Sequence, residues 1–282
     1  MSNATAPELN FPLEEIQERL NLMEQKISFL IEETRKIQSE IYIHDSITDG
    51  EEKRLLDLTE KKVYSLLNEI ISKHFPFDSI SSEEEIKLTG KNNFTWVLDP
   101  IDGSMNFLRR VPMYSISIGI QHRDHNVAGI VICPDFHDTY TAILGQGAYK
   151  NNVKISVSEI TKIDRSLLIS AFPSNRKIIL TEILADLSAF LTSGRSIRRT
   201  GSIVLDFCWI AEGRIDGLWE KSVGLFDLSA ASVILKEAGA TITDYKGDYN
   251  LTYPSEIVVS NGFIHSQILE ILKKSRQELS LN

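Results

Sequence analysis

The spacing of hydrophobic residues changes once along this chain, and this change sets the strongest limit on its fold. Up to His74, apolar side chains recur at helical intervals of three and four over two segments, 12–43 and 54–74. Beyond Phe75-Pro76 they alternate with a period of two, as in half-buried strands. We therefore expect two amphipathic helices that pack on a following sheet, joined by the polar loop HDSITDGEE. A coiled-coil arm is the alternative for the first helix, although its spacing is not a strict heptad.

Short strands are expected from the segment FTWVLD to the segment KISVS, with a hairpin at Gly145 and Gly147. After about residue 155, strands and helices alternate, which implies a layered α/β architecture. We divide the chain into a flexible lead-in over 1–11, an α+β lobe over 12–155 and an α/β lobe over 156–282. The acidic segments discussed below lie mostly in the first lobe.

The charge and cysteine content disfavour several classes of protein. A net charge of −9 and a pI near 5.3 argue against a nucleic-acid surface, because phosphates would be repelled. Cys133 and Cys208 stand in apolar runs, where buried, reduced thiols of a cytoplasmic protein are the simplest interpretation. No apolar segment is long enough to span a bilayer, and the N-terminus lacks the order of a secretory signal.

The segment DPIDGS, residues 99–104, ends a hydrophobic run with two carboxylates three positions apart. Pro100 fixes its φ angle and stiffens the turn, and Gly103 lets the backbone approach a ligand closely. A helix starting at Ser104 would direct free amides toward the same point and favour an anion there. Carboxylates beside such a helix start suggest Mg²⁺ held between protein and phosphate. Taken alone, the motif is better explained as an Asp-capped turn that has no chemical role.

Acidic residues at two other places complete the pattern. The run Glu83-Glu84-Glu85 precedes the FTWVLD strand, and Asp227 stands at a predicted helix start. Taken singly, the first is typical of a solvated face and the second of an N-cap.

Together these segments resemble the inositol monophosphatase-like family of Mg²⁺-dependent, lithium-sensitive phosphatases. DPIDGSMNF is similar to the family signature Asp-Pro-Ile/Leu-Asp-Gly-Thr/Ser, and Glu83-Glu84 matches its upstream pair of glutamates. Asp227 matches the aspartate that begins a helix ending in Gly-Gly, here Gly239-Ala240. The resemblance runs from about residue 55 to the C-terminus. It implies the layered α-β-α-β-α sandwich of the inositol monophosphatase and fructose-1,6-bisphosphatase superfamily.

The resemblance also implies a site with two or three Mg²⁺ ions. It assigns the first ion to Glu83, Asp99 and the backbone carbonyl of Ile101, and the second to Asp99, Asp102 and Asp227. Glu84 is a secondary candidate with an outer role. By the same resemblance, Glu83 and the Ser104 hydroxyl hold the attacking water, with Asp102 beside them.

Further roles follow from the same resemblance. The amides of Gly103 and Ser104 would hold phosphate oxygens. In the family this hydroxyl pairs with an aspartate, and the matching residue here is Glu60, which is one methylene longer. A surface acid without a catalytic role is the alternative for Glu60, and Asp57 could take its place. The substrate pocket would be lined by four residues: Ser174, Gly201, Ser202 and Glu220.

We therefore expect a Mg²⁺-dependent phosphate-monoester hydrolase acting on myo-inositol 1-phosphate, in a cytoplasmic homodimer without nucleic-acid or membrane partners. Fructose-1,6-bisphosphatase, histidinol-phosphatase and 3′-phosphonucleotide phosphatase activities remain open within the same chemistry. A regulatory or binding protein with weak catalysis is the alternative from another class. The departures at Glu60 and Ser104 and the long first helix motivate that alternative.

Overall fold

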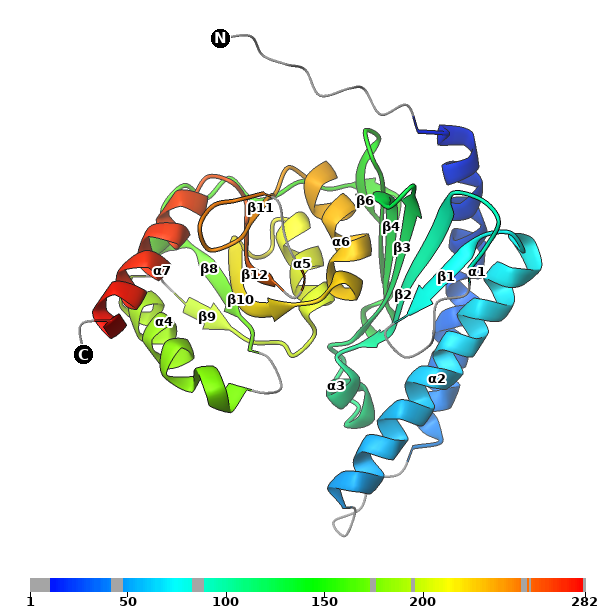
Figure 1. Cartoon of the computed structure of the whole chain (residues 1–282), viewed down its shortest axis with the longest axis horizontal. Coiled ribbons are helices and arrows are strands. Elements are labelled where there is room, and N and C mark those ends of the chain that lie inside the picture. Colours follow the sequence, from blue (N-terminus) through cyan, green and yellow to red (C-terminus); the bar gives the residue numbers. More distant parts are fainter. Residues whose placement is uncertain are drawn as a thin grey trace.

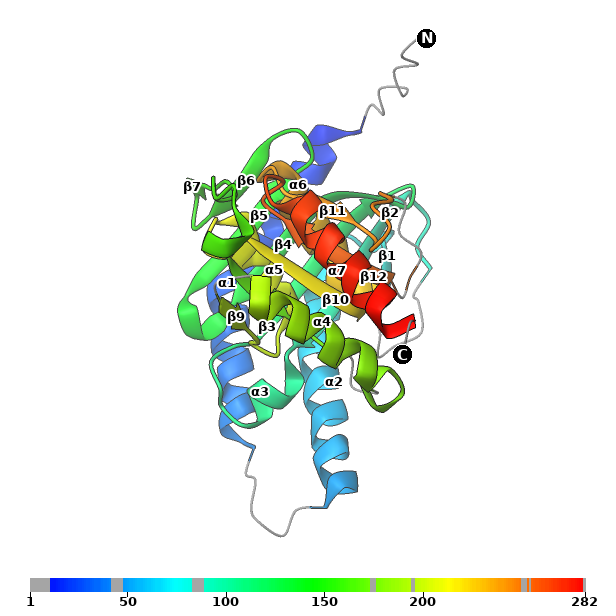
Figure 2. The same ribbon diagram turned by 90° about the vertical axis from the view of Figure 1, so that its left-hand side faces the viewer.

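The computed structural model describes residues 11–41, 48–82, 89–172, 176–193, 196–249, 253 and 255–280. Most of the expected lead-in therefore lies outside the described residues. Figures 1 and 2 show two sheets separated by helices, with further helices on both outer faces. The expected α-β-α-β-α order of layers is confirmed.

The first sheet follows the chain order from one edge to the other, β1 to β7. Only the pair β1–β2 is parallel, and every other neighbouring pair is antiparallel. Its strands are β1 (Ser79–Ser82), β2 (Phe94–Asp102), β3 (Ser115–His122), β4 (His125–Cys133), β5 (Asp138–Ile143), β6 (Gly147–Lys150) and β7 (Val153–Lys154). The edge strand β1 was not expected from the sequence, because SISS is short and polar.

Two long helices, α1 (Leu13–Ser39) and α2 (Asp49–His74), cover the outer face of this sheet. The core between these helices and the sheet contains the even-numbered isoleucines of β3, among them Ile116 and Ile118. The first helix therefore packs on the sheet, as expected, and does not form a coiled-coil arm. Helix α2 starts earlier than expected, because Thr48 and Glu51 form a capping box and draw the end of the expected loop into the helix.

The second sheet has the order β11-β12-β10-β8-β9. Its strands are β8 (Leu167–Ser170), β9 (Ser196–Arg198), β10 (Gly217–Val223), β11 (Thr241–Thr243) and β12 (Ser255–Ser260). Helices α4 (Leu180–Ser193) and α7 (His265–Ser280) cover its outer face.

Helices α5 (Ile203–Ala211) and α6 (Leu225–Glu237) lie between the two sheets. The apolar cluster around them combines residues of β4 and β5, such as Val131 and Tyr140, with residues of the second sheet, such as Ile257. The two expected lobes thus share one buried layer, and the boundary near residue 155 stays a prediction. Within the described ranges, no helix is long and apolar enough to cross a membrane.

Candidate active site

Strand β2 ends within the DPIDGS segment, at Asp102, and its register shifts between Asp99 and Asp102. Asp99 pairs with Ser117 and Asp102 with Ser115, so three residue steps on β2 oppose two on β3. Proline lacks an amide hydrogen and is tolerated where the ladder skips a bond. This bulge places both carboxylates at the end of the strand, where β2 meets the short helix α3 (Ser104–Leu108).

Gly103 forms the corner between β2 and α3. Its φ of +84° lies in the left-handed region, which favours glycine. A Cβ there would also lie 3.0 Å from both the Met113 carbonyl oxygen and the Cβ of Ser202. Glycine is therefore required by conformation and by space, and the close approach to a ligand that the sequence suggested stays a prediction.

Asp102 is buried against the beginning of α5. Its carboxylate accepts hydrogen bonds from the Ser202 hydroxyl, the Ser115 hydroxyl (3.2 Å) and the amides of Ile203 (3.2 Å) and Val204 (3.0 Å). Burial raises the pKa of Asp102, and these four donors act in the opposite direction. The helix start stabilises the negative charge and fixes the orientation of the carboxylate.

Asp227 lies in the first turn of α6 and belongs to the other half of the chain. Its Oδ2 accepts the Gly224 amide at 2.7 Å, as an acid in the third helical position commonly does. The sequence suggested an N-cap, and the structure places Asp227 three residues further on. The carboxylate is half-buried.

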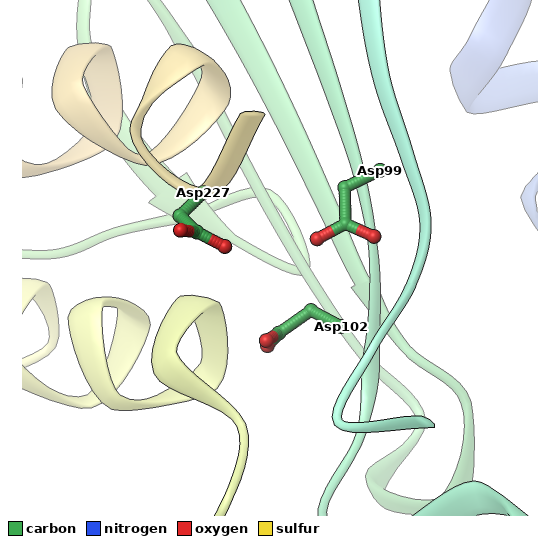
Figure 3. Close-up of side chains that lie close together, drawn as sticks. All are labelled: Asp99, Asp102 and Asp227. Carbon is green, nitrogen blue, oxygen red and sulfur yellow. The ribbon is translucent and has the colours of Figure 1, made fainter. Parts of the chain in front are cut away.

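Asp99, Asp102 and Asp227 each offer one carboxylate oxygen, and these oxygens lie within 4.8 Å of one another. Figure 3 shows Asp99 and Asp102 on β2 and Asp227 on α6 around a common space. Three carboxylates at this separation repel each other unless a cation lies among them. An all-oxygen donor set suits a hard divalent cation such as Mg²⁺. The residues present therefore fit the metal that the sequence resemblance implies.

A pocket of about 620 Å³ opens beside these acids. Its lining joins the start of α3, the turn before α5, strand β10 and the start of α6. The lining residues are Asp102, Gly103, Ser104, Met105, Asn106, Ala171, Phe172, Arg199, Gly201, Ser202, Ile203, Glu220, Ser222, Val223 and Asp227. All of the expected phosphate and substrate residues within the described ranges border this one space.

Glu220 is a buried carboxyl group of this pocket, only 4% exposed, and its pKa is raised from 4.5 to about 7. Burial is the main cause of the rise, opposed by hydrogen bonds from the amides of Lys221 and Ser222. Its Oε2 has no hydrogen-bond partner among the described residues. From the sequence, a pairing of Glu220 with a surface lysine near Lys221 is the alternative to a substrate contact. In the structure, the neighbouring Lys221 instead pairs with Glu182 and Glu256.

Several predicted site residues are placed without their proposed contacts being tested. Ser104 opens α3 and borders the pocket, and Ile101 is buried in β2. Glu60 is half-buried on α2. Its pairing with Ser104 stays a prediction. Glu83, Glu84 and Ser174 lie outside the described residues.

The sequence reasoning did not single out two contributors to the site. Ser115 donates to Asp102, but in the sequence it is one polar residue of an alternating strand. Arg199 borders the pocket with its guanidinium 5.0 Å from the centre of the Phe172 ring. From the sequence, four arginines could contact a second phosphate: Arg109, Arg110, Arg198 and Arg199. Chain folding alone selects Arg199 from that group.

The comparison with known sequences decides the relationship. The profile of the inositol monophosphatase family matches residues 14–279. The chain belongs to this family. It is also 30% identical to the Nus factor SuhB of Escherichia coli K12 over 222 residues, which is 78% of this chain and 82% of that protein.

Solved structures of the family share the fold. The inositol monophosphatase of Anabaena sp. PCC 7120 has a TM-score of 0.80 at 25% identity, with 92% of this chain and 97% of that chain covered. The structure of SaIMPase-II with bound inositol monophosphate has a TM-score of 0.76 and covers 94% of this chain and 99% of that chain. At 20% identity, this second likeness concerns the fold alone.

Proposed function

We propose that this protein is a Mg²⁺-dependent phosphatase that hydrolyses a phosphate monoester, with myo-inositol 1-phosphate as the favoured substrate. The observation that carries the proposal is the convergence of Asp99, Asp102 and Asp227 to within 4.8 Å at the edge of a pocket. Family membership supports the reaction class and favours the inositol ester as the substrate.

Each of the predicted site residues would have a separate role in this reaction. Asp99, Asp102 and Asp227, with Glu83 and the carbonyl of Ile101, would hold two or three Mg²⁺ ions. Bound Mg²⁺ would supply Lewis-acid activation of water and neutralise charge on the phosphate.

The amides of Gly103 and Ser104 are proposed to bind phosphate oxygens. Ser104, with Glu83 and Glu60, is proposed to orient the water, and Glu84 to act from further out.

Glu220 is proposed to accept hydrogen bonds from substrate hydroxyls in the pocket. Its unpartnered Oε2 supports this role, because a buried acceptor is costly unless a donor reaches it. Gly201, Ser202 and Ser174 are the remaining proposed substrate contacts. Since the Ser202 hydroxyl already donates its proton to Asp102, it could contact the substrate only as an acceptor.

Release of inorganic phosphate from a substrate panel would test the proposal. The panel contains myo-inositol 1-phosphate, fructose 1,6-bisphosphate, histidinol phosphate and a 3′-phosphonucleotide, each with Mg²⁺ and after chelation. We expect Mg²⁺-dependent turnover that is fastest with the inositol ester and inhibited by Li⁺. Faster turnover of the nucleotide would overturn the substrate, and turnover unaffected by chelation would overturn the metal mechanism.

A non-enzymatic role is the second candidate, because relatives at about 30% identity are named Nus factors. In that case the chain would act by binding another macromolecule, with weak or no catalysis. A variant without phosphatase activity separates the two candidates: a cellular role that survives Asp102→Asn would favour binding. A cytoplasmic location and a homodimer are proposed on family grounds only.

A further inference from the structure

The proposed metal site depends on how closely α6 approaches the first sheet, because Asp227 comes from the helix and Asp99 from the sheet. Two glycines, Gly119 on β3 and Gly129 on β4, are direct cross-strand neighbours. Side chains that alternate along a strand point to opposite faces, so Gly119 shares its face with Ser117, the cross-strand partner of Asp99. The glycine pair therefore lies on the face of the sheet that bears Asp99.

The backbone of α6 rests directly on this bare patch. A Cβ at Gly119 would come within 2.8 Å of the Ser229 Cβ, closer still to the Ser229 hydroxyl, and within 3.1 Å of the Ala230 nitrogen. A Cβ at Gly129 would lie 2.8 Å from the Ala230 carbonyl carbon and 2.9 Å from its Cα. Neither glycine has a φ angle in the left-handed region, since both lie within regular strands. Lack of space, and not backbone conformation, therefore requires glycine here.

The contact and the acid cluster are in register. Gly119 is two residues beyond the cross-strand partner of Asp99, and Ser229 is two residues beyond Asp227 on α6. Two residues along a strand span about 7 Å, so the glycine patch is next to the place where the carboxylates meet. Any increase in the separation of α6 from the sheet at Ser229 would be transmitted to Asp227 through less than one helical turn.

We propose that Gly119 and Gly129 are positioning residues for the metal site. Because glycine has no side chain, α6 can pack close enough to the sheet to bring Asp227 to Asp99 and Asp102. This inference rests on the proposed function only in taking the three acids as metal ligands. It assigns a site-specific purpose to two residues that lie outside the pocket and carry no functional group.

The test measures binding of Mn²⁺ or Mg²⁺ by calorimetry, with the metal-induced rise in melting temperature as a second readout. Gly119→Ala should weaken binding by about 10- to 100-fold, the range typical of residues that orient metal ligands. Gly217→Ala is the matched control: it is also a strand glycine, and its Cβ would meet Ile268 of α7 instead of α6. This control should lower the melting temperature without changing metal affinity.

A second substitution keeps the inference testable even if Gly119→Ala folds poorly. Ser229→Gly removes both side-chain atoms that the new Cβ would meet, so the double variant should recover metal affinity relative to Gly119→Ala. The same change should not rescue Gly129→Ala, because that Cβ would meet backbone atoms of Ala230.

The outcomes are separable. Wild-type protein that binds no divalent cation would refute the proposed function. Normal metal binding by wild type and by Gly119→Ala alike would refute the positioning role, as would equal weakening by Gly217→Ala.

Discussion

The Ser202 hydroxyl donates a hydrogen bond to the Asp102 carboxylate, although 100 residues separate them along the chain. Ser202 also caps α5, with its Oγ accepting the Leu205 amide, so one hydroxyl joins the helix start between the sheets to the end of β2. This link helps to fix the orientation of the Asp102 carboxylate, one oxygen of which lies within 4.8 Å of oxygens of Asp99 and Asp227.

Replacing Asp102 by asparagine should lower phosphate release by more than ~100-fold, since even residues that only orient metal ligands cost 10–100-fold when changed. The amide keeps the size of the side chain and removes its charge. Asp124→Asn, in the exposed β3–β4 turn, is the control and should leave the rate unchanged. Unaltered turnover in the Asp102 variant would mean that this residue holds no metal.

Mg²⁺ should stabilise the folded protein, because the cation relieves repulsion among three neighbouring carboxylates. At a concentration of 100 Kd the gain is about 2.7 kcal/mol, which corresponds to a rise in melting temperature of several degrees. Asp227→Asn should abolish most of this rise. Thermal unfolding followed with and without Mg²⁺ measures it, and an equal rise in both proteins would contradict the assignment.

Glu220 should make stability depend on pH in a direction unusual for a carboxyl group. Its pKa is raised from 4.5 to about 7 in the folded state, so the folded protein holds this proton more tightly than the unfolded chain. The contribution of Glu220 to the free energy of unfolding is therefore fully present below pH 4.5 and is lost as the pH rises through 7. A shift of this size corresponds to roughly 3 kcal/mol. Glu220→Gln should therefore gain stability relative to wild type between pH 5 and pH 8.

Urea unfolding of both proteins at these two pH values tests that prediction. Other buried acids, such as Asp206, also have a raised pKa, but they are common to both proteins and cancel in the comparison. A difference in unfolding free energy that is the same at both pH values would show that Glu220 does not titrate in this range.

Arg19→Met should destabilise the fold by about 3–5 kcal/mol, because it leaves the buried carboxylate of Asp78 without its cation. Arg19 on α1 contacts Asp78 through two hydrogen bonds of 2.8 Å, and both side chains are at most 5% exposed. The guanidinium also stacks 3.6 Å from the centre of the Phe94 ring. Chemical denaturation measures the loss.

The double variant Arg19→Met, Asp78→Asn is the informative companion to this experiment. It should recover part of the lost stability, since no unpaired charge then remains buried. If the double variant loses as much stability as the two single variants together, the ion pair itself contributes little.

Hydrophobic period predicted the types of element well, because it depends directly on which face of a helix or strand is buried. The order of the layers was implied by the family resemblance. The helices before Phe75 and the strands after it are confirmed. The sequence missed β1, whose four residues gain their strand conformation by pairing with β2 and not from their own composition. It also placed the start of α2 too late, since the capping residues resembled a loop.

The sequence by itself determined the chemistry available: the aspartates of DPIDGS, a glycine at the corner after them, and Asp227 far downstream. The family resemblance implied that Asp227 meets Asp99 and Asp102, and the tertiary structure brings their carboxylate oxygens within 4.8 Å. Only the tertiary structure decided that Ser115 and Ser202 hold Asp102, and that Arg199 borders the pocket while Arg109, Arg110 and Arg198 do not. The physical reason is that residue types and local periods are set by neighbours along the chain. The separation of two carboxylates from different elements is set by how closely a helix can lie on a sheet. Here that distance depends on Gly119 and Gly129, which have no side chains to hold α6 away from the sheet.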